Sequence, residues 1–175
     1  NLTKYVSQEN ADRFRIQVLT GIMKGVEFLH SRKIIHRDLK PANILMKKQE
    51  SDPPYRTIIA DFGLGREIPP NCEELTKSTN FNGTLGWIAP EFYQPSIPKV
   101  TESVDIFSCG CLFYYVLTRG KHPFGEKSKR EINIEKAEHD LSLVFNMHNN
   151  TAQCLIEQMI HHSSQLRPSA SQILL

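Results

Sequence analysis

The stretch HRDLKPANIL, residues 36–45, decides how the rest of the chain is interpreted. The apolar pair Ile34-Ile35 comes directly before it, and Ile44-Leu45-Met46 overlaps its end. Short apolar runs of this kind are typical of buried strands, whereas the polar residues between them are typical of a loop. The sequence therefore predicts a loop that is held between two short strands.

Three side chains of this loop carry the groups that a phosphoryl transfer requires. An acceptor hydroxyl must lose its proton, the charge of the transferring group must be offset, and a divalent metal needs oxygen ligands. Asp38 can accept the proton, Lys40 can reach the γ-phosphate of ATP, and Asn43 can offer a side-chain oxygen to Mg²⁺. The alternative is a charged surface turn, but a chance turn would not match this pattern at several independent positions.

Length and composition describe an ordinary globular chain. With 175 residues the chain is long enough for one domain with a sizeable core. The formal charge of +2 is too small to indicate a nucleic-acid or membrane surface. No apolar run approaches the roughly 18 residues of a membrane span, and a signal-peptide pattern is absent at the N-terminus. We expect this segment neither to span a membrane nor to direct secretion.

The cysteines and histidines form no metal-binding pattern. The cysteines, which show no paired CxxC spacing, are Cys72, Cys109, Cys111 and Cys154. We expect buried thiols in a reducing compartment rather than zinc ligands or disulfides. The histidines expected to be surface or capping residues are His122, His139, His148, His161 and His162.

Helical periodicity dominates the chain. A long amphipathic helix is predicted from Ser7, its candidate N-cap, to about His30. The segment from Ser103 to Thr118 is apolar on all sides, which predicts a helix in the middle of the core. The remaining expected helices are one or two short ones between Glu126 and Asn150, an amphipathic one over Thr151 to His161, and a last one from Ser169.

The predicted strands are few and short. A third strand is expected at Thr57 to Ala60, after a solvated excursion from Lys47 to Arg56. The polar segment from Leu64 to Leu85 is predicted to be a mobile loop. These expectations add up to an α+β fold, mostly α-helical, in a single domain over residues 1–175.

The tripeptide Asp61-Phe62-Gly63 follows the third predicted strand and has the character of a metal-binding turn. Asp61 can ligate Mg²⁺ from the side opposite Asn43, Gly63 permits backbone angles closed to other residues, and Phe62 can fill an apolar pocket. Such turns are common, so the tripeptide alone is a weak signal. Its place 18 residues after Asn43, beyond a loop and a strand, makes it specific.

Hydroxyl side chains are frequent in the loop that follows. Phosphate added to Thr76, Ser78 or Thr79 would bring about two negative charges, which Arg37, next to the candidate base, can receive. The alternative is that these hydroxyls are merely solvated. Thr84 differs from them, because its hydroxyl can bond the loop at residues 38–40 and favour serine or threonine acceptors.

Two carboxylates are predicted to hold the structure together. Glu91 has apolar neighbours and needs a partner, for which the planar fork of Arg167 is the natural candidate. Asp105, in the first turn of the central helix, is interpreted as an anchor for the backbone of residues 36–38. The alternatives are that Glu91 and Arg167 face solvent unpaired and that Asp105 is a plain helix cap.

Taken in order, these motifs resemble the C-terminal lobe of a eukaryotic serine/threonine protein kinase over almost the whole chain. The resemblance implies that Asp38 is the catalytic base, that Lys40 binds phosphate, and that Asn43 and Asp61 bind Mg²⁺ with ATP. Lys40-Pro41 after the base is the pattern of serine/threonine rather than tyrosine kinases. The implied supporting residues are His36, Arg37, Phe62, Gly63, Glu91, Asp105 and Arg167, and the implied activation loop contains Thr76, Ser78, Thr79 and Thr84.

A closer resemblance is carried by GTLGWIAPE at residues 83–91 and by VDIFS at residues 104–108, where most kinases have tryptophan in place of Phe107. These segments, with FYYV at 113–116 and HPFG at 122–125, are similar to the inositol-requiring kinase and endoribonuclease family, the sensors of the unfolded-protein response. The resemblance implies a longer parent anchored in the endoplasmic reticulum membrane, with this segment on the cytosolic face. Such a parent phosphorylates itself within a homodimer and controls an endoribonuclease domain.

The sequence contains no glycine-rich phosphate loop, no Val-Ala-Ile-Lys strand, no ribonuclease domain and no membrane span. We therefore expect residues 1–175 alone to bind Mg-ATP weakly and not to turn over, and to bind no nucleic acid. An alternative function is a nucleotide-responsive dimerisation scaffold that controls a ribonuclease, with phosphoryl transfer secondary. A purely structural helical domain would leave the metal-binding and proton-accepting groups without purpose.

Overall fold

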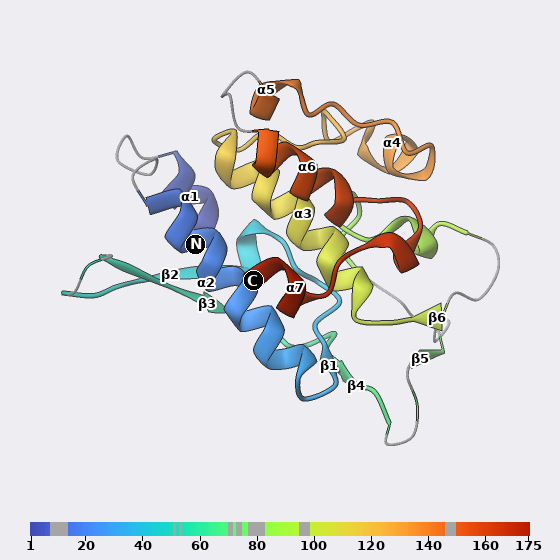
Figure 1. Ribbon diagram of the computed structural model, residues 1–175, viewed down its shortest axis with the longest axis horizontal. Helices are drawn as coiled ribbons and strands as arrows, with labels where there is room; N and C mark the ends of the chain where they lie inside the picture. Colours follow the sequence, from blue (N-terminus) through green and yellow to red (C-terminus); the bar gives the residue numbers. More distant parts are fainter. Residues whose placement is uncertain are drawn as a thin grey trace.

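The computed structural model describes residues 1–7, 14–50, 52, 54–69, 72, 75–76, 83–94, 99–145 and 150–175 (Figure 1). The α-helices are α1 (Leu2–Val6), α2 (Arg15–His30), α3 (Ser103–Leu117), α4 (Arg130–Glu135), α5 (Ser142–Phe145), α6 (Asn150–Met159) and α7 (Ala170–Leu174). The strands are β1 (Ile34–Ile35), β2 (Ile44–Lys48), β3 (Tyr55–Ile59), β4 (Arg66–Glu67), β5 (Leu75–Thr76) and β6 (Lys99–Val100). Three short 3-10 helices are η2 (Pro41–Asn43), η3 (Pro90–Phe92) and η4 (Ser164–Leu166). Helix predominates, so the predicted α+β fold, mostly α-helical, is confirmed.

Helix α3 runs through the core, as its apolar sequence predicts. All its residues except Ser103 and Tyr115 are buried, and the helix lies between α2 and α6 (Figure 1). Gly110 allows α6 to approach closely, because a Cβ there would lie 2.6 Å from Cγ2 of Ile160 and 2.9 Å from Cβ of Met159. A larger side chain at position 110 would force the two helices apart.

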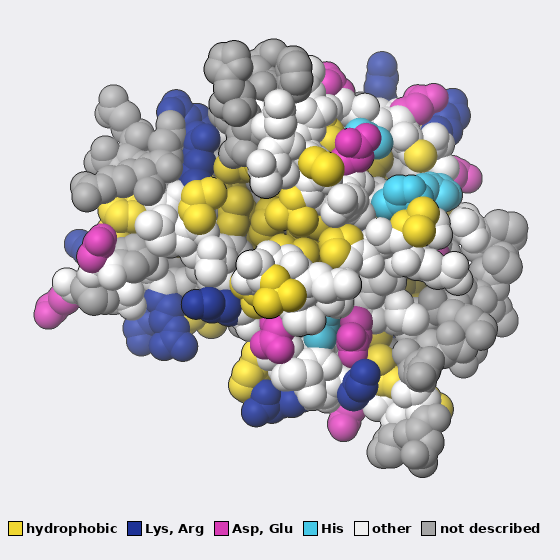
Figure 2. Space-filling model, in the orientation of Figure 1, with side chains coloured by type: hydrophobic (Ala, Val, Ile, Leu, Met, Phe, Trp, Pro, Cys, Tyr) yellow, Lys and Arg dark blue, Asp and Glu magenta, His cyan; other side chains and the backbone are white. Residues whose placement is uncertain are grey.

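Strands β2 and β3 form an antiparallel hairpin that is longer than predicted. The pairing runs from Ile44 with Ile59 to Lys48 with Tyr55, so both strands extend into the segment that was predicted to be a solvated excursion. Half-exposed strands tolerate charged residues on their outer face, which is why the polar composition concealed these strand ends. In Figure 2, lysines and arginines gather near this hairpin, whereas hydrophobic side chains gather between α1 and α6.

Helix α2 rests directly on β3 through two glycines. A Cβ at Gly25 would lie 2.8 Å from Cδ1 of Ile59, and one at Gly21 would collide with Oγ1 of Thr57. The absence of side chains at these two positions sets the distance between the helix and the hairpin. Because the hairpin begins where the loop of residues 36–43 ends, this contact also positions the loop.

The segment from Leu64 to Leu85, predicted to be a mobile loop, contains two short strands among its described residues. Strand β4 pairs with β1, and β5 pairs with β6, both in antiparallel fashion. Two residues are too few to show a strand period, and both pairings join segments far apart in sequence. The described part of the predicted loop therefore has strand pairing at these two places, which the sequence did not indicate.

The prediction of one helix beginning at Ser7 was also wrong. Ser7 is the C-cap of α1, whose N-terminus is capped by the side chain of Asn1. The longer helix, α2, begins at Arg15, and residues 8–13 lie outside the described part of the chain. The local sequence resembles an N-cap because serine is favourable at either end of a helix.

The expected helices of the C-terminal half are present. Helices α4 and α5 are the two short ones, α6 is the amphipathic one, and α7 begins after Ser169, which forms a capping box with Gln172. Among the described residues no helix is both long enough and apolar enough to cross a membrane.

Two expectations about isolated side chains need correction. Cys109 and Cys111 are buried as predicted, but Cys72 and Cys154 are exposed. His122, expected at the surface, is only 5% exposed and packs edge to face against Trp87, with ring centroids 4.7 Å apart. An imidazole that stays neutral behaves as an apolar ring, which sequence composition does not reveal. His148 lies outside the described residues.

The structure joins Glu91 and Arg167 in a buried ion pair. Nη1 and Nη2 of Arg167 donate to Oε1 and Oε2 of Glu91 at 2.9 and 2.8 Å. The other three N–H groups of the guanidinium donate to the backbone carbonyls of His161, Ser103 and His162. All five donors are thus satisfied, and the pair links η3, the start of α3 and the segment before η4.

We predict that Arg167→Lys lowers the free energy of unfolding by about 3 kcal/mol, because lysine cannot reproduce five fixed donors and would leave buried acceptors unpaired. Urea denaturation of the purified protein measures this change. Arg56→Lys, at an exposed position of β3, is the matched control and should change stability by less than about 0.5 kcal/mol. Equal effects of the two substitutions would contradict the role given to Arg167.

The burial of His122 makes the stability of the fold depend on pH. Burial, with the positive charge of Arg130 as a smaller cause, lowers the pKa of His122 to about 3, although the backbone of Gly86 acts in the opposite direction. The unfolded chain therefore binds a proton that the folded chain does not between pH 6.5 and 3, so stability falls as the pH is lowered through this window. From pH 7 to pH 5 we expect this residue to account for a loss of about 2 kcal/mol.

His122→Gln should remove this contribution and flatten the dependence of stability on pH. The measurement is urea denaturation of both proteins at pH 5 and pH 7, comparing the differences rather than the absolute values. An unchanged pH dependence in the variant would show that His122 does not carry the effect.

Candidate active site

The backbone of the loop at residues 36–38 is held by a single carboxylate from the central helix. Oδ2 of Asp105 accepts the backbone N–H of His36 at 2.8 Å, and Oδ1 accepts that of Arg37 at 2.9 Å. Nε2 of His30, at the end of α2, lies 3.0 Å from Oδ2. Asp105 is 1% exposed, so these donors replace the water that the carboxylate loses.

This anchor holds the loop in a strained backbone conformation. Arg37 has a φ of 68°, a left-handed angle that costs a non-glycine residue about 1–2 kcal/mol. Its N–H is one of the two that Asp105 accepts, so the hydrogen bond offsets the strain where it occurs. The ring of His36 adds a second fixed contact, with Nε2 at 3.1 Å from the carbonyl oxygen of Ala60.

Asp38 is the point where the candidate catalytic side chains meet. Oδ2 of Asp38 lies 2.7 Å from Nζ of Lys40 and 3.1 Å from Nδ2 of Asn43. Its Oδ1 accepts the Oγ1 hydroxyl of Thr84 at 2.6 Å and the backbone N–H of Thr84 at 3.1 Å. Lys40 also donates to Oγ1 of Thr84 at 2.6 Å, which closes the triangle. The structure thus brings together a base, a cation, an amide and a hydroxyl from two segments.

Asn43 and Asp61 have oxygen atoms suited to a divalent cation. Nδ2 of Asn43 donates to the side chain and the carbonyl oxygen of Asp38, which leaves Oδ1 without a hydrogen-bond donor among the described residues. Asp61 is exposed, and it follows Ala60, whose N–H donates to the carbonyl oxygen of Asn43 at 2.9 Å. An amide oxygen and a carboxylate are ligands that Mg²⁺ accepts, so these residues fit the ion.

The tripeptide after β3 differs from its predicted form in two details. The left-handed residue is Asp61, with a φ of 65°, whereas Gly63 does not have a positive φ. Phe62 fills no pocket, because it is 49% exposed and touches the ring of His36 with centroids 5.1 Å apart. Aspartate tolerates the left-handed region better than most residues, which explains why the glycine is not needed there.

The candidate activation-loop hydroxyls are only partly described. The backbone of Thr76 lies in β5, whereas Ser78 and Thr79 lie outside the described residues. Arg37, their candidate partner, is buried. Burial and, next, the positive charge of Arg66 lower the pKa of Arg37, while Asp105 raises it.

Sequence reasoning missed His30 and Arg66. His30 ends α2 and contacts the anchor carboxylate, and a histidine at the end of an apolar helix before a charged loop was the signal that could have revealed it. Arg66 lies on β4, whose pairing with β1 brings it close to the loop. Strands β1 and β4 are about 30 residues apart in sequence, so no local sequence pattern predicts their pairing.

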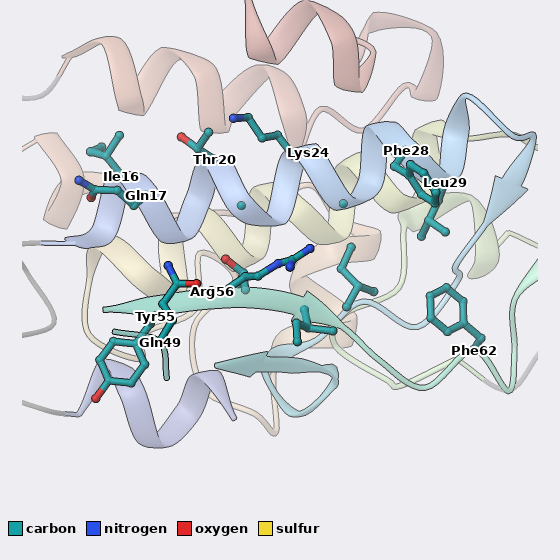
Figure 3. Close-up of a pocket in the computed structure, with 15 residues that line it drawn as sticks. Ile16, Gln17, Thr20, Lys24, Phe28, Leu29, Gln49, Tyr55, Arg56 and Phe62 are labelled. Atoms are coloured by element: carbon teal, nitrogen blue, oxygen red, sulfur yellow. The ribbon is translucent and has the colours of Figure 1, made fainter. Parts of the chain in front are cut away.

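A cavity of about 860 Å³ lies between α2 and β3, away from Asp38 (Figure 3). Its apolar lining includes Ile16, Phe28 and Ile58, all of them partly exposed, and Phe62 stands at one end. Arg56 projects from β3 towards α2 in the same view. This cavity shares only Phe62 with the candidate site.

We predict that Asp105→Asn lowers the free energy of unfolding by about 2–4 kcal/mol. Asparagine has one oxygen where aspartate has two, so its amide NH₂ group would face a backbone N–H of the loop. Two buried hydrogen-bond donors would then point at each other with no acceptor between them. Chemical denaturation gives the value, and Asp52→Asn, at an exposed position, is the control expected near zero. An unchanged midpoint for Asp105→Asn would show that the anchor is dispensable.

Comparisons with known proteins agree with this geometry. The protein kinase domain family matches residues 2–175. The human serine/threonine-protein kinase/endoribonuclease IRE2 is 40% identical over 99% of this chain and 19% of its own length. The Caenorhabditis elegans kinase/endoribonuclease ire-1 is 36% identical over 99% of this chain and 18% of its own. The Arabidopsis thaliana kinase/endoribonuclease IRE1a is 36% identical over 91% of this chain and 18% of its own.

The chain thus spans about a fifth of the length of these curated relatives. The family match extends over nearly all 175 residues, and the loop at residues 36–45, the turn at residues 61–63 and the ion pair of Glu91 with Arg167 occur within it in the expected order. The match and the clustering of Lys40, Asn43 and Thr84 around Asp38 lead to one conclusion: this chain belongs to the protein kinase family.

Proposed function

We propose that the protein containing this chain is a serine/threonine kinase that transfers the γ-phosphate of ATP to hydroxyl groups of a protein substrate. The observation that carries the proposal is the carboxylate of Asp38, 8% exposed and contacted by Lys40, Asn43 and Thr84. A carboxylate fixed by several donors beside the acceptor site can take the proton of a bound hydroxyl.

Each neighbour of Asp38 has a distinct role in the proposed transfer. Asp38 accepts the proton of the acceptor hydroxyl, and the ammonium group of Lys40 contacts the γ-phosphate and offsets its negative charge. Asn43 and Asp61 hold Mg²⁺, which supplies charge neutralisation for the phosphates when bound. Thr84 fixes Oδ1 of the base and links it to the segment that would carry the acceptor peptide.

We propose that one substrate is the protein itself. Thr76, Ser78 and Thr79 are the candidate acceptors, phosphorylated by a second copy within a homodimer. Arg37 and Arg66 would then receive the phosphate, because two cations that repel one another gain from a shared anion.

We further propose that the parent protein couples this domain to an endoribonuclease in the unfolded-protein response, on the cytosolic face of the endoplasmic reticulum membrane. The support is that the relatives described above are named kinase/endoribonucleases. The partly exposed apolar side chains that line the cavity of Figure 3 offer a surface on which another part of the parent can pack.

We predict that Asp38→Asn in the full-length protein lowers kcat for phosphoryl transfer by roughly a thousandfold, because the general base is lost. The dissociation constant for Mg-ATP should change little, since Asn43 and Asp61 remain. Asp61→Asn should instead weaken Mg-ATP binding. The assay follows transfer of labelled γ-phosphate, with Asp52→Asn as the control at an exposed carboxylate. Full activity of Asp38→Asn would exclude Asp38 as the base.

The same variant separates the kinase from the alternative of a nucleotide-responsive scaffold that controls an endoribonuclease, an activity that the names of the relatives include beside the kinase. If Asp38→Asn also abolishes RNA cleavage by the full-length protein, phosphoryl transfer is required for the output. If cleavage persists and still responds to nucleotide, dimerisation driven by nucleotide binding is the main function.

A further inference from the structure

A pocket of about 370 Å³ opens beside the candidate catalytic loop, on the side of Lys40 that faces α1 and α4. Its wall includes Lys40, Ala42, Trp87, Tyr115 and Arg130. Because Lys40 both lines this pocket and lies 2.7 Å from Asp38, the pocket borders the place where an acceptor hydroxyl would bind. A role for this pocket in acceptor binding rests on the proposed kinase function.

The position of Arg130 in this wall is fixed by its surroundings. Its Nε donates to the carbonyl oxygen of Gly125 at 3.0 Å, and its guanidinium carbon lies 5.8 Å from the centre of the Trp87 ring. The aliphatic part of the side chain covers Gly86, where a Cβ would be 3.1 Å from Cδ of Arg130. A guanidinium held in this way keeps its charge in one place.

The terminal nitrogens of Arg130 form no ion pair with a carboxylate among the described residues. In the part of the chain that the structure describes, the lining of the pocket contains two cations, Lys40 and Arg130, and no acidic side chain. Lys40 already contacts Asp38 and Thr84. Within the same described residues, Arg130 donates one hydrogen bond, to Gly125. Burial lowers the pKa of this guanidinium, and the more distant charge of Glu126 acts in the opposite direction. A guanidinium that lies against the Trp87 ring, in a pocket whose described lining has no carboxylate, favours negative charge in a ligand.

We propose that this pocket binds an acidic side chain of the acceptor polypeptide, close in sequence to the phosphorylated hydroxyl, and that Arg130 determines this specificity. An extended chain advances about 3.3–3.6 Å per residue. With the acceptor hydroxyl at Asp38, a side chain one to three residues away can therefore reach the pocket on the other side of Lys40. The activation segment of a second copy fits this requirement, because Glu73 and Glu74 lie three and two residues before Thr76.

Three peptides with the sequence of residues 70–82 test the proposal with the full-length enzyme. The first has Glu73 and Glu74, the second has glutamine at both positions, and the third has lysine. We expect kcat/KM for the glutamate peptide to exceed that for the glutamine peptide by roughly fivefold, as for a partly exposed charge pair. The lysine peptide should be the poorest substrate.

Variants of Arg130 identify the group responsible. The ratio between peptides should fall to about one in Arg130→Gln, should invert towards the lysine peptide in Arg130→Glu, and should persist in Arg130→Lys. Lys127→Ala, an exposed cation nearby that does not line the pocket, should leave the ratio unchanged. Since each ratio is taken within one protein, a loss of folded enzyme cancels.

The outcomes separate this inference from the proposed function. Equal rates with all three peptides would overturn the acidic specificity while leaving the kinase intact. A glutamate preference that persists in Arg130→Gln would exclude Arg130 as its source. Failure of the wild-type enzyme to phosphorylate any peptide or protein acceptor would overturn the proposed function, and the specificity with it.

Discussion

The carboxylate of Asp105 is the constraint on which the rest of the site depends. It comes from the most deeply buried helix and is itself almost inaccessible to water, so it is stable there only while His30, His36 and Arg37 donate to it. Those donors fix the loop in a conformation that Arg37 would not adopt alone. The core and the candidate active site are therefore one structure, and a change in α3 changes the direction in which Asp38 points.

The first turns of α3 hold both segments that meet at Asp38, namely the loop at residues 36–43 and the segment of residues 84–87. Asp105 holds the loop, Ser103 offers its carbonyl oxygen to Arg167, and Oγ of Ser108 donates to the carbonyl oxygen of Trp87 at 2.8 Å. Trp87 in turn lies three residues after Thr84, whose carbonyl oxygen accepts its N–H at 3.0 Å. The distance of 2.6 Å between Thr84 and Asp38 is thus maintained from two sides, each tied to the same helix.

The residues of the candidate site were predictable because kinase motifs are local and ordered, and the central helix was predictable because its apolar character is continuous. Features that depend on long-range contact were not. The pairs β1–β4 and β5–β6 are too short to show a period, and the burial of His122 depends on Trp87, 35 residues earlier in the chain. The left-handed angle falls on Asp61, the metal-binding candidate itself, rather than on Gly63 two residues later.

The hydrogen bonds of Asp38 also indicate the order of steps in the proposed reaction, with the nucleotide binding before the acceptor hydroxyl reaches the base. A carboxylate has about four lone-pair positions, and here Oδ1 accepts the N–H and hydroxyl of Thr84 while Oδ2 accepts Lys40 and Asn43. An acceptor hydroxyl can therefore reach the base only after one donor leaves. Thr84 and Asn43 are held by their backbones and by the loop, whereas Lys40 is a flexible chain whose proposed destination is the γ-phosphate. Arrival of the nucleotide would then free the base, so that Asp38 accepts a proton only when a phosphate is present to receive the oxygen.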